Sequence, residues 1–211
     1  MLTDWNENRA RLTGQAMEEP EYSHTNHGED FFRFPLRSRR LSGAADQLNL
    51  LVSRTVLERQ SVHPGDRLTA EGEVRSYNNR SGVGSRLVIT LFTKQLTPAG
   101  QEPDDNRLTL AGVLCKTPNY RTTPLGREIC DLMLAVNRKY GRADYLPCIA
   151  WGVLAQRAAE LSVGDGLRLE GRLQSRAYTK VTETGQVKRV AFEVSIMTME
   201  PVEAWAVSEL K

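Results

Sequence analysis

The chain has 211 residues, enough for one large domain or two of common size, and its formal net charge is only +2. A polyanionic partner would therefore have to bind in a local basic groove. The sequence contains no long apolar run, which excludes a membrane-spanning helix. Its N-terminus lacks the basic and apolar regions of a secretory signal, so we expect a cytoplasmic protein.

An internal repeat organises the chain. When the sequence is shifted against itself by 98 residues, Gly, Pro and Asn recur at matching positions, and such residues supply the backbone angles that turns require. The matches are Asn8 with Asn106, Leu12 with Leu110, Gly14 with Gly112, Pro20 with Pro118, Tyr22 with Tyr120, Gly28 with Gly126, Leu36 with Leu134, Asp46 with Asp144, Leu48 with Leu146 and, after a one-residue gap, Gly65 with Gly164 and Gly72 with Gly171. Both halves are predicted to follow the same backbone path.

The repeat sets the expected domain boundaries. Residues 1–96 form a first, diverged copy, residues 106–200 a second copy, and residues 201–211 a short C-terminal tail. Residues 97–105 are predicted to be a linker, because Pro, Gly and acidic residues concentrate there and hydrophobic alternation lapses.

In the first copy, the stretch HTNHGED places His24 and His27 beside two carboxylates, a pattern that could indicate a metal site. The favoured alternative is a polar turn at a hairpin tip, because the repeat aligns this stretch with TPLGRE in the second copy. The sequence has no Gly-rich phosphate loop, no activated Ser or Cys nucleophile, and no H-x-E with C-x-x-C. We therefore expect no enzymatic activity, no cofactor and no metal, and a metal-dependent nuclease is a remote alternative.

The first copy also carries a cationic stretch. Arg33, Arg37, Arg39 and Arg40 lie close together, and Arg54, Arg75 and the aromatic Tyr77 follow. Two interpretations remain open: a track that contacts nucleic-acid phosphates, with weak base stacking, or an ordinary solvated face.

The second copy gives the clearest secondary-structure pattern. Strands are predicted over residues 106–114, 129–136, 145–151 and 167–173, and VLAQRAAEL between the last two is the one clear helical stretch. Gly112 suggests a bend or bulge in a curved first strand. This order is typical of an OB-fold. The predicted fold class is all-β: two tandem OB-fold five-stranded Greek-key barrels, each with a short helix between strands 3 and 4.

The second copy also resembles a known family. NRLTLAGVL, TPLGRE, AWGVLAQRAAEL and GDGLRLEGRLQSRAY occur in the order found in the oligonucleotide-binding domain of the bacterial single-stranded DNA-binding protein family. The resemblance implies non-catalytic, largely sequence-independent binding of single-stranded DNA in replication, recombination, repair or mobile-element transfer. RNA is not distinguished from DNA, because contacts to the 2′-hydroxyl are not visible in a sequence.

In that family, aromatic side chains stack on bases, and four family positions are aromatic here: Tyr140, Tyr145, Trp151 and Tyr178. Basic residues are interleaved with them in sequence: Arg121, Arg127, Arg138, Lys139, Arg142, Arg172, Arg176 and Lys180. The alternative, in which Trp151 is core and the tyrosines are ordinary surface, is disfavoured because four aromatics coincide with family positions.

The first copy departs from this pattern. Ser42, Gln47 and Ser53 stand where the second copy has aromatics, and only Tyr77 keeps a ring, so phosphate contacts should dominate there. Such a departure leaves a second interpretation open, in which the protein is of the primosomal type and its OB-folds dock a helicase or polymerase. The family's acidic recruiting tail is not seen in PVEAWAVSELK, so recruitment of replication or repair proteins is in doubt.

Two further expectations concern thiols and assembly. Cys115, Cys130 and Cys148 lack metal-ligand spacing and fall in predicted strands, so they should be small apolar residues of a reduced interior. Family members generally assemble four OB-folds, and two copies per chain would reach that number in a homodimer. A monomer is the alternative.

Overall fold

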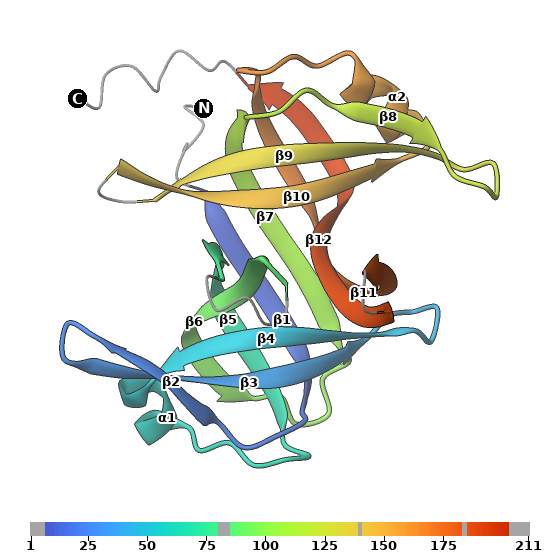
Figure 1. The fold of residues 1–211 in the computed structure, drawn as a ribbon. Helices are drawn as coiled ribbons and strands as arrows, with labels where there is room; N and C mark the ends of the chain where they lie inside the picture. The colour runs from blue at the N-terminus through green and yellow to red at the C-terminus, as the bar shows by residue number, and fades with distance from the viewer. Residues whose placement is uncertain (1–6, 80–84, 139–140, 183–184, 203–211) are drawn as a thin grey trace. The chain divides into compact units, whose positions relative to one another are not determined.

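The structure is a computed structural model that describes residues 7–79, 85–138, 141–182 and 185–202 (Figure 1). Contacts divide the chain into two compact units. The first-copy unit contains Arg9–Arg107 together with Gln174–Phe192, and the second-copy unit contains Met1–Asn8, Leu108–Leu173 and Glu193–Lys211. A short segment of the second copy's sequence is therefore part of the first-copy unit.

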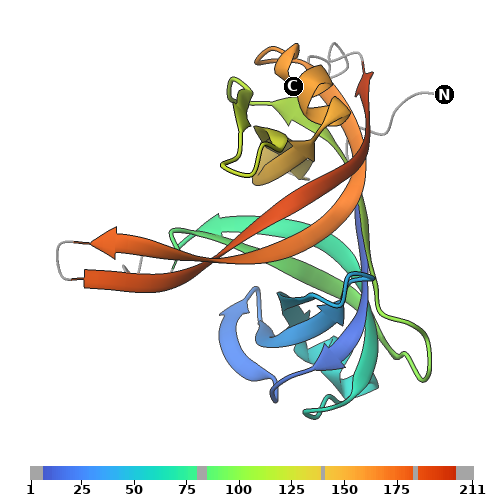
Figure 2. The same ribbon diagram turned by 90° about the vertical axis from the view of Figure 1, so that its right-hand side faces the viewer.

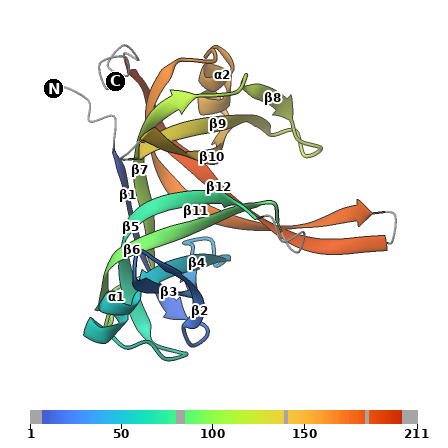
Figure 3. The same cartoon turned by 60° about the vertical axis from the view of Figure 1, so that its left-hand side comes forward.

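The first copy forms strands β1 (Asn8–Ala16), β2 (Glu21–Asn26), β3 (Glu29–Arg39), β4 (Ala45–Ser53), β5 (Arg67–Asn78) and β6 (Leu87–Pro98), with helix α1 (Arg54–Arg59) after β4. The strand β1 pairs antiparallel with both β5 and β3, β3 pairs with β4, β4 runs parallel to β6, and β6 returns to β5. These pairings close a five-stranded barrel, and β2 is added to it as an exposed edge strand on β3. The helix α1 contacts β3, β4 and β6 (Figure 3).

The second copy repeats this topology with β7 (Asp105–Leu114), β8 (Asn119–Thr122), β9 (Glu128–Arg138), β10 (Arg142–Trp151), α2 (Val153–Ala159), β11 (Gly166–Thr182) and β12 (Gly185–Val202). Here β7 pairs with β11 and β9, β9 with β10, and β10 runs parallel to β12, which neighbours β11. Each copy is thus an OB-fold barrel with its helix between the third and fourth barrel strands, as the sequence predicts.

The repeat is visible in the cores. Leu12, Leu36 and Leu48 are fully buried in the first barrel, and their repeat partners Leu110, Leu134 and Leu146 are fully buried in the second. Burial of alternate residues on each strand follows from the period of two, which sends every second side chain inward. The same inward set therefore specifies both barrels.

Glycine fixes close backbone contacts at matching points. A Cβ on Gly72 would lie 2.0 Å from the carbonyl oxygen of Phe92, and one on Gly171 would lie 2.4 Å from that of Ser195. The predicted bend at Gly112 is a related feature, because a Cβ there would lie 2.4 Å from the carbonyl oxygen of Ala135, where β7 passes from β11 to β9. No side chain fits at these crossings.

One detail differs from the sequence expectation. The fourth strand of the second copy was expected to end at Leu173, but β11 continues to Thr182 and lies beside β12 as a long two-stranded arm (Figure 2). The residues expected to be a linker are anchored to the first-copy unit, because Arg67 pairs with Asp104 at 2.7 Å and Arg11 with Glu102 at 2.9 Å. Neither helix in the described ranges has the length and apolar character needed to cross a membrane.

Candidate nucleic-acid interface

Two of the predicted stacking residues project from one face of β10. Asp144, Leu146, Cys148 and Ala150 are buried, so alternation turns Tyr145 and Trp151 outward, with exposed fractions of 52% and 39%. The rings are six residues apart, which corresponds to about 20 Å along an extended strand. The exposure of Trp151 argues against its being a core residue, and the spacing suits contact with two different nucleotides.

The other described aromatic of the second copy, Tyr178, lies on β11 within the segment that belongs to the first-copy unit. Its side chain is 36% exposed, and the guanidinium carbon of Arg176 lies 6.0 Å from its ring centre. A cation beside an aromatic ring is a combination that can contact a phosphate and a base together.

Three of the predicted binding residues cannot be placed: Lys139 and Tyr140 lie outside the described residues, and so does the side chain of Lys180. Of the remaining basic residues, Arg127 and Arg142 are exposed, Arg121 is exposed and pairs with Asp131 at 2.8 Å, and Arg172 is half-buried on β11.

Two predicted phosphate contacts have a structural role instead. Arg40 donates from Nε and Nη2 to the two carboxylate oxygens of Asp46, at 2.7 and 2.5 Å, and Asp46 is fully buried. Its repeat partner Arg138 donates in the same bidentate way to buried Asp144. Because a buried carboxylate requires such a partner, these two guanidinium groups serve the fold, and we do not retain them as phosphate contacts.

The remaining cations of the first copy are partly available. Alternation on β3 buries Phe34, Leu36 and Ser38, so Arg33, Arg37 and Arg39 all project from its outer face. Arg33 lies 3.7 Å from Glu21, with both side chains well exposed. Arg37 and Arg39 form no ion pair with another residue in the described ranges. These three arginines are called the β3 arginine row below.

Arg54 and Arg75 have internal partners. Arg54 pairs with Asp30 at 2.7 Å and its guanidinium carbon lies 5.5 Å from the Phe32 ring centre, whereas Arg75 pairs with Glu73. Hydrogen bonds from Thr25 and then Arg54 hold the pKa of the Asp30 carboxyl below its usual value. Their contribution to binding remains a prediction.

The HTNHGED stretch forms the tip of the β2–β3 hairpin, as the polar-turn interpretation predicts. His27 and Gly28 both have positive φ, 47° and 79°, which suits a tight hairpin turn. The ring of His24 stacks on Phe31 with centroids 5.2 Å apart. No group of three or more His, Cys, Asp or Glu side chains suited to a metal occurs among the described residues.

The cysteines occupy the second barrel. Cys130 and Cys148 are buried and Cys115 is half-buried, and all three are free thiols. Desolvation raises the pKa of each thiol above its ordinary value. A raised pKa disfavours the reactive thiolate, in line with a packing role.

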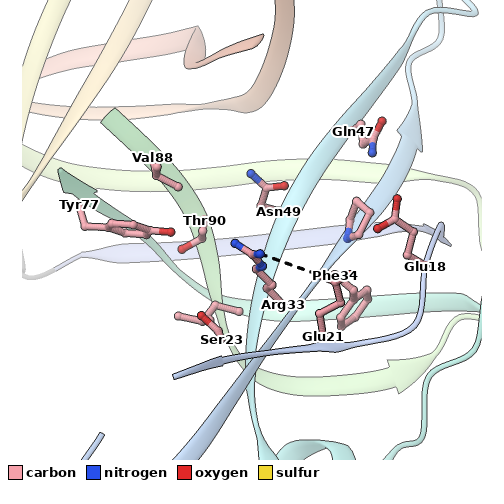
Figure 4. Close-up of a pocket in the computed structure, with 12 residues that line it drawn as sticks. Glu18, Glu21, Ser23, Arg33, Phe34, Gln47, Asn49, Tyr77, Val88 and Thr90 are labelled. Atoms are coloured by element: carbon pink, nitrogen blue, oxygen red, sulfur yellow. Dashed lines mark ion pairs between the residues drawn. The ribbon is translucent and has the colours of Figure 1, made fainter. Parts of the chain in front are cut away.

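A cavity of about 320 Å³ lies on the outer face of the first barrel, between β3, β4 and β6 (Figure 4). Its lining includes Gln47, Tyr77, Arg33, Asn49 and Thr90. The first three were noted from the sequence, but Asn49 and Thr90 were not. The available signal was the alternation of β4, which places Gln47 and Asn49 on the same outward face.

Two closed five-stranded barrels with outward aromatic and basic side chains define a tandem OB-fold protein. Residues 105–202 match the model of the single-strand binding protein family. The match covers the second copy.

Curated relatives align with a part of this chain of similar length. The chain is 38% identical over 80 residues to single-stranded DNA-binding protein 2 of Listeria innocua, which covers 35% of this chain and 50% of the relative. It is 42% identical over 79 residues to the single-stranded DNA-binding protein of Thermus aquaticus, which covers 35% of this chain and 30% of the relative. The chain spans about half the length, or less, of the curated relatives it matches.

Solved structures extend the likeness to both copies. The wild-type single-stranded DNA binding protein from Thermus aquaticus has a TM-score of 0.76 and 22% identity, and 93% of each chain is covered. A deletion mutant of that protein gives a TM-score of 0.74 and 23% identity, covering 93% of this chain and 94% of the other. The likeness concerns the fold, and it includes the diverged first copy.

Proposed function

We propose that this protein binds single-stranded DNA, largely without sequence preference and without catalysing a reaction. The observation that carries the proposal is the pair of outward rings, Tyr145 and Trp151, on one face of β10 in the segment that matches the single-strand binding protein family. Each nucleobase offers a π-face to such a ring, so stacking tolerates any sequence. Arg121, Arg127, Arg142, Arg172 and Arg176 supply cations in the second copy.

A titration tests this proposal. Fluorescently labelled oligo-dT of several lengths, an RNA of the same lengths and a duplex are each titrated with the protein at two salt concentrations. Single strands should bind with a salt-dependent affinity and the duplex should bind weakly. Absence of single-strand binding at low salt, or equal affinity for the duplex, would refute the proposal.

The β3 arginine row should neutralise phosphates in the first copy. Changing Arg37→Gln and Arg39→Gln together should reduce the slope of log affinity against log salt by about 0.7 for each phosphate that is no longer neutralised, hence by about 1.4. The control is Arg59→Gln with Arg157→Gln, which removes the same charge from the two helices. An unchanged slope in the first variant, or an equal change in the control, would show that the row does not bind phosphates.

We further propose that the protein assembles as a homodimer with four OB-folds, the number implied by its family. Light scattering at micromolar concentration should give twice the 23.7 kDa mass of one chain. A mass near that of one chain, both with and without oligonucleotide, would exclude the dimer.

A further inference from the structure

The cavity on the first barrel differs chemically from the aromatic face of the second copy. The repeat places Gln47 and Asn49 on β4 where β10 has Tyr145 and Pro147. Two amide side chains therefore replace a ring and a proline on the outward face. Among the described residues, neither side-chain amide has a hydrogen-bond partner. The cavity volume of about 320 Å³ lies at the lower end of the range for small-ligand sites, about 300–1,000 Å³.

The buried Thr90 hydroxyl points independently to a ligand. Thr90 is only 5% exposed, it lines the cavity, and its Oγ1 has no hydrogen-bond partner in the part of the chain that the structure describes. A buried hydroxyl without a partner is unfavourable, so native proteins normally supply one. A polar ligand atom inside the cavity would satisfy it. Figure 4 shows Thr90 beside Tyr77, Val88 and Asn49 in the cavity wall.

The other lining groups suit a planar base. Tyr77 is 50% exposed and offers a ring for stacking, while Gln47 and Asn49 offer the donor and acceptor pair that reads a base edge in two hydrogen bonds. Glu18, Glu21 and Arg33 also line the cavity, and Arg33 lies 3.7 Å from Glu21. Glu18 forms no ion pair within the described ranges, and an ionised carboxylate can only accept hydrogen bonds. The Glu18 carboxylate therefore attracts an exocyclic amino group and repels the carbonyl oxygens of thymine, whereas the charge of Glu21 is partly offset by Arg33.

We propose that this cavity holds a single nucleobase and selects adenine or cytosine over thymine by hydrogen bonds to its edge. The inference rests on the proposed binding of single-stranded DNA and adds to it a base preference confined to the first copy. The second copy provides affinity by stacking, and the cavity provides a modest selectivity as the strand crosses the first barrel.

The test compares oligonucleotides of dA, dC and dT of equal length with the wild-type chain, Thr90→Val and Asn49→Leu. Thr90→Val removes the hydroxyl that has no partner and keeps the shape of the side chain. Asn49→Leu removes one amide from a half-buried site. Each variant should lower the preference for dA and dC over dT by about 2- to 10-fold, the worth of one hydrogen bond, while dT affinity stays the same.

The matched control is Thr93→Val on the same strand. Thr93 is also buried, but its Oγ1 donates to the carbonyl oxygen of Leu91 at 3.3 Å and it does not line the cavity. The Thr93→Val variant should have the same base preference as the wild type. Circular dichroism verifies the fold of every variant. If the wild type binds no single strand, the proposed function fails. If it binds all three strands and Thr90→Val and Asn49→Leu leave the preference unchanged, the base-reading cavity is refuted while DNA binding stands.

Discussion

Replacing Asp46 with Ala should lower the free energy of unfolding by about 3–5 kcal/mol, because removing one partner leaves the other charge of a buried pair uncompensated. The Asp46 carboxylate is fully buried and accepts two hydrogen bonds from Arg40. It also accepts one from the backbone N–H of Ser175, at 2.8 Å. The variant therefore leaves both a guanidinium and an N–H of β11 without their acceptor.

Urea-induced unfolding followed by circular dichroism measures this effect. Asp131→Ala is the matched control, because Asp131 also pairs with an arginine, Arg121, but both side chains are substantially exposed. Exposed pairs contribute about 0–1 kcal/mol, so the control should lose little. Similar losses for Asp46→Ala and Asp131→Ala would contradict the buried-pair assignment.

Ser175 also joins the arm of β11 to the first-copy unit. Besides the bond to Asp46, its Oγ accepts a hydrogen bond from the backbone N–H of Gln47, at 3.1 Å. These two contacts join the start of β4 to residue 175, far away in the sequence. The Asp46 carboxylate, on β4, thus connects the turn between β3 and β4, which carries Arg40, with Ser175 on β11.

Much of the barrel could be predicted from the sequence because its signals are local. Leu108 and Leu110 alternate with outward residues on β7, glycines mark the turns, and the helix predicted over residues 153–161 is observed as α2. The repeat then carries the prediction to the first copy, where hydrophobic alternation is weaker. Each of these features depends on neighbouring residues or on one fixed offset.

The long arm could not be predicted, because it has no local signal in the sequence. Beyond Leu173, the residues Arg176, Ala177, Tyr178 and Thr179 of β11 are all exposed, so no alternation of buried and exposed positions marks the strand. Pairing with β12 holds this strand in place, and a pairing partner is not visible in a single segment.

The ion pairs and the cavity were missed because they depend on tertiary contacts. Arg40 belongs to a basic run that reads equally well as a phosphate track, and only the closure of the β3–β4 hairpin reveals Asp46 as its partner. Thr90 lies on β6, far in sequence from Asn49, and β4 and β6 meet only through a parallel pairing. Charge runs identify candidates, but the fold decides which charges are already neutralised.

Replacing Tyr145 and Trp151 with Ala should weaken binding to oligo-dT by about 1–3 kcal/mol for each ring, or roughly 5- to 150-fold per ring. The physical reason is the loss of two stacking surfaces that project from one face of β10. Both side chains are well exposed, so the substitutions create no large cavity and the barrel should keep its fold.

Fluorescence anisotropy with labelled oligo-dT measures the loss, and thermal unfolding verifies the fold. Tyr120→Ala is the control, since Tyr120 is a comparably exposed ring, at 41%, on the edge strand β8. The strand register places Tyr120 on the opposite face of the sheet from Arg121 and Trp151. The affinity of the Tyr120→Ala variant should match the wild type. A folded double variant that binds oligo-dT as tightly as the wild type would show that β10 does not stack on bases, and the DNA path would then have to follow the β3 arginine row and Tyr178.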